Sequence, residues 1–265
     1  MIRKYLACAR IGVKDAITYR FAFLISMLTS PIGLVIFYFL WKTIFSHTGK
    51  EVIRGFTFEA MVSYYALNMI IGFLIWTYID EDIEHNIITG ELTPWLLRPL
   101  NYFWEVFFHH LGIHGIAVLV EIIPLSAIAA IFFGLSAPSF INGLVFVIML
   151  CLGIFINFLL SYLVGLTAFW FKQIGGIRRV RRVVVSFLAG SFIPLTFFPD
   201  WVSQASKFLP FQYTRYAPIT VYLGKHELAS ALWLLLIALL WAIGLYIISI
   251  AVWRKAYKKF AGSGV

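Results

Sequence analysis

Long stretches of the chain contain no ionisable residue, and their lengths give the first indication of its architecture. Three such runs extend from Phe21 to Trp41, from Ala60 to Ile79 and from Ile122 to Phe171. A helix needs about 20 residues to cross the hydrocarbon core of a bilayer, so the first two runs each predict one membrane span. The third run is long enough for two spans, and the turn-forming sequence GLSAPS at 134–139 divides it.

Extended to the whole chain, the pattern predicts six transmembrane helices, at 21–45, 59–79, 105–133, 141–171, 183–198 and 228–253. The other segments are an amphipathic helix at 1–20, a short polar segment at 80–101, a basic loop at 172–182, a proline-broken segment at 199–224 and a tail at 254–265. The composition, 62% hydrophobic and 12% charged, also indicates a membrane protein. We therefore expect a single all-α membrane domain.

The first twenty residues have an amphipathic pattern. Arg3, Arg10 and Lys14 fall on one helical face, while apolar residues including Leu6 and Val13 fall on the other. This pattern predicts a helix that lies in the membrane interface. A cleavable signal peptide is not expected, because the segment is highly charged and no small-residue cleavage site follows a short apolar core.

Lys and Arg are divided unevenly between the two predicted sides of the membrane. With six spans, 15 of the 21 basic residues lie on the side of the two termini and six lie on the other. The positive-inside rule then places both termini in the cytoplasm. Topology and attraction to anionic lipid account for the net charge of +9, so we do not expect nucleic-acid binding.

The sequence ITGELTPWLLRPL at 88–100 is a half-polar interruption between two apolar spans. Gly90 can end a helix in the left-handed conformation. Thr93 is expected to cap a new helix with Pro94 at its first position, and Pro99 is expected to stop it. The short helix would carry a knob of three large apolar side chains: Trp95, Leu96 and Leu97.

Acidic residues are concentrated beside this knob. Five of the chain's twelve carboxylates lie here: Asp80, Glu81, Asp82, Glu84 and Glu91. An acidic patch next to an apolar knob suits a cleft on a soluble partner, where aromatic anchors supply affinity and charges steer the encounter. The alternative is a rigid connector on the lipid headgroups, with Trp95 as an interface anchor.

Prolines break the segment before the last predicted span. Asp200, directly after Pro199, is expected to be the N-cap of a short amphipathic helix that begins at Trp201, includes Phe208 and ends at Pro210. Non-helical backbone at membrane depth must be covered by protein or face a wet cavity. We therefore expect a re-entrant segment that caps the outer mouth of a pathway.

Ionisable residues inside the predicted spans are concentrated in the third one, at Glu105, His109, His110, His114 and Glu121. At 100° per residue, His110, His114 and Glu121 project within about 40° of one another. One interpretation is a metal or proton site. In the other, water and headgroups reach the first four residues, and Glu121 faces the bundle interior.

Two further features allow both a functional and a structural interpretation. The aromatic residues Phe155, Phe158, Tyr162 and Phe169 could line a path for an apolar substrate or simply pack. The basic sequence IRRVRR at 177–182 could grip phospholipid or a partner, or serve as a topology anchor alone.

The chain lacks the short motifs that carry catalysis. There is no H-E-x-x-H, no G-x-S-x-G and no G-x-x-x-x-G-K sequence. Cys8 and Cys151 are the two cysteines, and their predicted depths rule out a disulfide or metal framework. Energy for any transport must therefore come from a partner or from a gradient.

Two sequences, IITGELTPWLLRPL (87–100) and PLTFFPDWVSQASKFLPFQYTRYAPITVYLG (194–224), resemble the ABC-2 class of ABC-transporter permeases. The resemblance is to six-span bacterial subunits paired with a separate ATPase, and it covers essentially the whole chain. It implies a type II exporter fold in the bacterial inner membrane. It also implies a dimer with a second copy or a paralogue, joined to two nucleotide-binding subunits that hold ATP and Mg²⁺.

The resemblance implies that the cytoplasmic segment couples the chain to its ATPase. The residues expected to do so are Glu84, Thr89, Gly90, Glu91, Leu92, Pro94, Trp95, Leu96 and Arg98. No catalytic residue, metal or cofactor is expected on this chain, and the expected cargo is a lipophilic or amphiphilic drug, lipid or peptide. Two alternatives stay open: a metal or redox protein that uses the third-span His and Glu residues, and a gradient-driven carrier, against which the lack of an inverted repeat counts.

Overall fold

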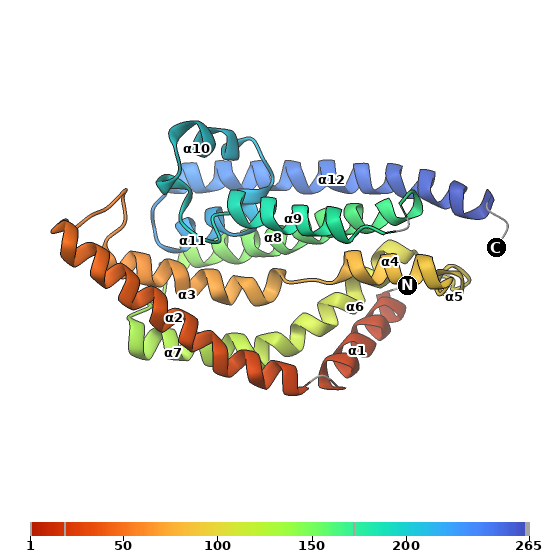
Figure 1. Ribbon diagram of the computed structural model, residues 1–265, viewed down its shortest axis with the longest axis horizontal. Helices are drawn as coiled ribbons and strands as arrows, with labels where there is room; N and C mark the ends of the chain where they lie inside the picture. The colour runs from red at the N-terminus through yellow and green to blue at the C-terminus, as the bar shows by residue number, and fades with distance from the viewer. Residues whose placement is uncertain (1, 19, 172, 263–265) are drawn as a thin grey trace.

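The computed structural model describes residues 2–18, 20–171 and 173–262, which form an elongated bundle of helices (Figure 1). Within these ranges the only bridge between extended residues is the pair Ile53 and Phe56. Lys172, at the start of the predicted basic loop, and residues 263–265 of the predicted tail lie outside the described residues. The all-helical architecture agrees with the prediction.

The α-helices, in chain order, are α1 (Ile2–Thr18), α2 (Arg20–Thr48), α3 (Phe58–Ile75), α4 (Ile79–Thr89), α5 (Leu92–Leu96), α6 (Tyr102–Ala117), α7 (Ile123–Phe133), α8 (Phe140–Leu166), α9 (Gly175–Leu188), α10 (Asp200–Lys207), α11 (Tyr216–Tyr222) and α12 (Leu228–Gly262). A π-helical turn, Val118–Ile122, joins α6 to α7. Short 3₁₀ turns lie at Thr167–Phe169, Leu195–Phe197 and Phe211–Thr214.

Among the described residues, five helical segments are long and apolar enough to cross a membrane: Thr29–Thr48, Phe58–Thr89, Tyr102–Phe133, Phe140–Phe169 and Leu228–Lys259. The predicted span at 183–198 is wrong in its position. Helix α9 begins earlier, at Gly175, and ends at Leu188, where Gly190 turns the chain with a φ of 76°. Its 14 residues measure about 21 Å, which is short for a crossing.

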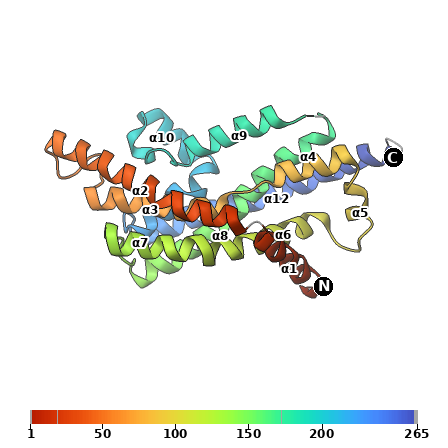
Figure 2. The same cartoon turned by 60° about the horizontal axis from the view of Figure 1, so that its bottom comes forward.

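The start of α9 also corrects the predicted basic loop. No helix-breaking residue lies between Ile177 and Leu188, so the helix includes the IRRVRR sequence. Helix α5 and the C-terminal part of α12 lie at one end of the molecule, and α10 and α11 lie at the other (Figures 1 and 2). The position of the two ends relative to a membrane remains a prediction.

Helix α8 is the centre of one of two apolar cores. It packs against α4, α6, α11 and α12, and the aromatic residues predicted to line a path lie inside this core. The ring of Phe103 lies 5.2 Å from that of Phe158 and 5.1 Å from that of Tyr162. Phe158, Tyr162 and Phe169 are buried, so their packing accounts for them. The second core joins α3 to α2, α7 and α11.

Helix α1 crosses α6 at a very close approach. Cys8, Gly12 and Ala16 recur every four residues, and all three are buried. A Cβ atom at Gly12 would overlap the backbone oxygen of His109, and one at Gly112 would overlap that of Ala9. Small residues at this spacing let helix backbones meet in a membrane environment. Leu6 and Ile17 stay exposed on the predicted apolar face.

Two predicted helix caps are wrong, by two residues for α5, whose cap is Glu91, and by one residue for α10. Helix α5 begins at Leu92, so Thr93 and Pro94 lie in its first turn, and α10 begins at Asp200 with Pro199 in the cap position. A first-turn proline loses no hydrogen bond, because first-turn N–H groups have no partner within the helix. Pro199 has the extended backbone that a cap position requires. The left-handed conformation of Gly90 is confirmed, with a φ of 79°.

Candidate functional site

The predicted second span is interrupted at 76–78, where α3 ends and α4 begins (Figure 1). Neither proline nor glycine lies at this break. The side chain of Asn157 in α8 donates from Nδ2 to the carbonyl oxygen of Ile75 at 2.6 Å, and the Thr77 hydroxyl accepts from Ile79 N at 3.3 Å. Side chains thus satisfy backbone groups that the break exposes, as buried irregular backbone requires.

Helix α4 then lies directly on α8. A Cβ atom at Gly165 would meet the Ile83 side chain at 2.9 Å and Asp80 Cα at 3.1 Å, so glycine permits the contact. Ile79, Ile83 and Leu92 are fully or almost fully buried in the core around α8. This packing fixes which face of α4 points toward α9.

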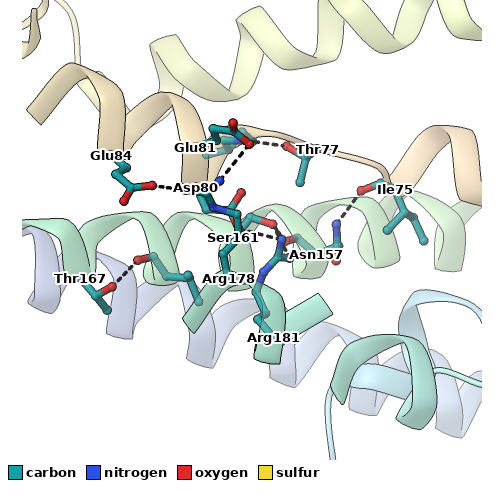
Figure 3. Close-up of polar contacts among 12 residues, drawn as sticks. Ile75, Thr77, Asp80, Glu81, Glu84, Asn157, Ser161, Thr167, Arg178 and Arg181 are labelled. Carbon is teal, nitrogen blue, oxygen red and sulfur yellow. Dashed lines mark hydrogen bonds and ion pairs between the residues drawn. The ribbon is translucent and has the colours of Figure 1, made fainter. Parts of the chain in front are cut away.

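Two residues of α4 form largely buried ion pairs with two arginines of α9 (Figure 3). Arg181 Nη2 donates to Asp80 Oδ2 at 2.9 Å, and Arg181 Nη1 donates to Ser161 Oγ of α8 at 2.7 Å. Asp80 has no solvent exposure, and 10% of the Arg181 side chain is exposed. Buried charges are stable only when paired and hydrogen-bonded, so this pair links α4, α8 and α9.

The second pair lies one helical turn later on α4 and one helical turn earlier on α9, because the two helices run in opposite directions. Arg178 contacts Glu84, and its Nη1 lies 2.9 Å from Glu81 Oε2. The Glu84 carboxylate also accepts from Ile174 N at 2.7 Å, next to the start of α9. We refer to Asp80, Glu81, Glu84, Arg178 and Arg181 as the α4–α9 ion-pair network.

This network corrects the predicted acidic patch. Asp80 and Glu84 do not face a soluble partner, because the arginines of α9 neutralise them inside the bundle. Asp82 is exposed but lies 3.2 Å from His110 Nε2. Glu91 stays exposed, 3.8 Å from His85. The arginines at 178 and 181 of the IRRVRR sequence therefore belong to an internal network, an outcome that neither interpretation included, while the other four residues of the sequence stay exposed.

The predicted apolar knob is also largely docked. Trp95 packs edge-on against Tyr102 with ring centroids 6.1 Å apart, and Leu96 packs against the core around α8. Arg98 covers the Trp95 ring, and its Nη1 donates to the buried Glu105 Oε1 at 2.6 Å. Glu105 is therefore paired inside the protein and not exposed to water and headgroups as one interpretation supposed.

A smaller surface stays exposed at this end of the molecule. Leu97 is 81% exposed and Ile88 is 57% exposed, with Thr89, Glu91 and Pro94 also exposed near them. We call these five residues the α5 surface. Exposed large apolar side chains that lie together are typical of a protein-binding site, and a nearby carboxylate such as Glu91 can steer a partner of opposite charge.

The five ionisable residues of the third span do not all converge on one site, although His110 and His114 line one small cavity beside Thr77 and Asn157. His109 Nε2 lies 2.8 Å from Asp15 of α1, and His110 pairs with Asp82 of α4. The π-helical turn Val118–Ile122 contains Glu121 and changes the angle per residue there. Glu121 therefore does not share the helical face predicted for His110 and His114. His114 lies in α6, one helical turn after His110. Within the described ranges, no group of three or more His, Cys, Asp or Glu side chains could hold a metal ion.

Hydrogen bonds hold both the turn after α9 and the proline-broken segment at 199–224 onto α3. Tyr64 and Tyr65 donate to the backbone oxygens of Gly190 and Phe192, at 2.6 and 2.7 Å. Arg215 Nη1 donates to both Asn68 O and Asn68 Oδ1. Of the predicted gate residues, Trp201 and Phe208 are strongly exposed, and Pro210 begins the turn toward α11. Their role as a gate remains a prediction.

Several residues of this site were missed from the sequence: Asn157, Ser161, Arg178 and Arg181. A signal for two of them existed, because carboxylates at 80, 81 and 84 and arginines at 178 and 181 each occupy one face of a helix. Without knowing that α9 begins at Gly175, the arginines were assigned to a loop. Asn157 and Ser161 carry no comparable signal inside a long apolar run.

Comparison with known proteins agrees with this architecture. The sequence model of the family described as ABC-2 family transporter protein matches residues 32–264, which include every helix of the ion-pair network. A search of curated proteins found no match. The apolar helices and the family match together show a multi-pass membrane permease. The chain belongs to the ABC-2 family of transporter proteins.

Proposed function

We propose that this chain is the transmembrane subunit of an ATP-driven exporter of a lipophilic or amphiphilic substrate. In this proposal, separate ABC ATPase subunits hydrolyse ATP, and two permease chains, identical or paralogous, form the transport unit in a bacterial inner membrane. Membership of the ABC-2 family implies association with an ABC ATPase. The direction of transport and the dimer are parts of the proposal.

The observation that carries the proposal is the continuous connection from the α5 surface to the centre of the bundle. Two residues separate α4 from α5: Gly90, and Glu91, which is the cap residue of α5. Helix α4 is ion-paired to α9 by Arg178 and Arg181. A displacement of α5 by a soluble subunit would therefore move α4 and α9 together.

The break at 76–78 supplies the place where such a movement can be absorbed. It lies between α3, which is packed against α2, α7 and α11, and α4, which is joined to α9. Hinges are short segments that absorb changes in φ and ψ between rigid bodies. In this mechanism ATP-driven closure of the ATPase subunits pulls α5, and α4 and α9 turn about the break.

The test is to coexpress the full chain with its cognate ABC ATPase and to purify through a tag on the ATPase alone. The proposal predicts a stable complex whose ATP turnover in nanodiscs depends on the α5 surface. Failure to form a complex would contradict it. A gradient-driven carrier would instead transport without the ATPase and would depend on Glu121.

A further inference from the structure

A cavity of about 140 Å³ lies beside the break between α3 and α4. Three arginines contribute to its wall, Arg181 and Arg182 from α9 and Arg215 from the segment before α11. Figure 3 shows other lining residues, Ile75, Thr77 and Asn157, near Arg181 at the same place. Side chains distant in the sequence thus bring three guanidinium groups to one cavity.

The positive charge of this cavity is only partly neutralised. Asp80 pairs with Arg181, but neither Arg182 nor Arg215 takes part in any ion pair found among the described residues. Arg215 instead donates to an amide oxygen and a backbone carbonyl of Asn68, which are neutral acceptors. Within the part of the chain that the structure describes, the guanidinium groups of Arg182 and Arg215 therefore have no counter-charge.

The position of the cavity along two candidate membrane spans gives this excess charge its significance. Ile75 and Thr77 lie near the middle of the candidate span Phe58–Thr89, and Asn157 lies near the middle of Phe140–Phe169. An uncompensated charge at membrane depth is costly and marks a site for a ligand or an ion. Arginine binds phosphate and carboxylate groups through two parallel hydrogen bonds.

The size and the other walls of the cavity limit what can bind. Pockets that enclose a whole drug-sized ligand have volumes of about 300–1,000 Å³, so this cavity suits a headgroup. Ser186 adds a hydroxyl to its lining, while Val185 and the exposed Trp76 add apolar surface. A molecule with one anionic group and an apolar remainder fits this combination.

We propose that the cavity binds the anionic headgroup, a phosphate or a carboxylate, of an amphiphilic molecule. Arg182 and Arg215 bind the anion, Ser186 donates a hydrogen bond, and the apolar part of the molecule lies along Trp76 and Val185. Binding is a property of this chain alone. The identification of this amphiphile as the transported substrate rests on the proposed exporter function.

The experiment is an isothermal titration of the purified full chain, in a nonionic detergent and without ATPase, with three separate probes. Lysophosphatidic acid carries the anion and the chain, monoacylglycerol carries only the chain, and inorganic phosphate carries only the anion. We expect lysophosphatidic acid to bind at least tenfold more tightly than either of the others. If monoacylglycerol binds as tightly as lysophosphatidic acid, the cavity does not recognise the anionic group. If inorganic phosphate binds as tightly, the apolar part of the molecule contributes nothing, and an amphiphilic ligand is excluded.

Three variants connect the binding to the cavity. Arg182→Gln removes an exposed guanidinium that holds no other helix, and Ser186→Phe fills the cavity without changing its charge; each is expected to weaken lysophosphatidic acid binding at least tenfold. The control, Arg179→Gln, removes an exposed charge of the same helix that does not line the cavity and should leave binding unchanged. Unchanged binding by Arg182→Gln, or equal weakening by Arg179→Gln, would overturn the proposal.

The two proposals fail separately. The titration contains no ATPase and so tests the cavity separately. If the chain binds the lysolipid but forms no ATPase complex, the headgroup site stands and the exporter function is refuted. If the chain forms the ATPase complex but does not bind the lysolipid, only the headgroup site is refuted.

Discussion

Arg181 and Asp80 are 101 residues apart in the sequence, and Arg181 Nη2 lies 2.9 Å from Asp80 Oδ2 inside the bundle. The pair joins α4, the helix that leads to α5, to α9, which lines the arginine cavity. Its position, and not its strength alone, makes it the central contact of the proposed coupling.

Replacing one member of this pair should destabilise the protein. Arg181→Gln or Asp80→Asn leaves the other charge buried without its partner, and such a change typically costs about 3–5 kcal/mol. Both variants should melt well below the wild type in detergent. The double variant should lose less than the sum of the two, because contacting residues are energetically coupled.

The matched control for this pair is Arg179→Gln on the same helix, where the arginine is exposed. It should melt with the wild type, since a surface substitution usually changes stability by less than about 0.5 kcal/mol. Strictly additive losses in the double variant would show that Asp80 and Arg181 do not stabilise each other.

The α5 surface should determine ATPase binding. Leu97→Ala removes a side chain that is 81% exposed and touches little of its own chain, so the permease should keep its melting temperature. Burial of a leucine side chain contributes about 1.5–3 kcal/mol, so we expect at least tenfold weaker binding to the ATPase in a pull-down titration. Phe140, the first residue of α8, is similarly exposed, and Phe140→Ala should leave ATPase binding unchanged.

The crossing of α1 and α6 should tolerate no side chain. Gly112→Ala places a Cβ on the backbone oxygen of Ala9, so α1 must separate from α6. Limited proteolysis should then cut within α1 of this variant and spare the wild type. Gly115→Ala in the same helix meets open space and should stay resistant, because alanine is the better helix former by about 1 kcal/mol.

The break between α3 and α4 should depend on Asn157. Asn157→Leu keeps a similar size but leaves the Ile75 carbonyl without its hydrogen bond, a loss of about 1–3 kcal/mol. Hydrogen exchange around 75–79 should become faster. Asn142 lies in the first turn of α8, and Asn142→Leu should leave hydrogen exchange at 75–79 unchanged. The same acceleration in both variants would contradict a specific role for Asn157.

The sequence predicted the parts of this fold that depend on hydrophobic periodicity. Charge-free runs located the apolar segments, and Gly90 ended α4 as expected because few other residues adopt its backbone conformation. The ionisable positions were harder to interpret, because a carboxylate such as Asp80 has the same local pattern whether it faces water or a distant arginine. The break at 76–78 gave no signal, since a side chain of α8 stabilises it.

Spin labels can measure whether α4 and α9 move together about the break between α3 and α4. The two native cysteines are first replaced, as Cys8→Ala and Cys151→Ala. One label pair joins α4 to α9, through His85→Cys and Val180→Cys, and the other joins α4 to the loop after α2, through His85→Cys and Val52→Cys; all three positions are exposed.

Distances are recorded by double electron–electron resonance on the complex with its ATPase, with and without ATP and Mg²⁺. If α4 and α9 move as one body, the 85–180 distance stays constant while the 85–52 distance changes on addition of ATP. An 85–180 distance that changes with ATP, while the 85–52 distance stays fixed, would contradict this joint movement.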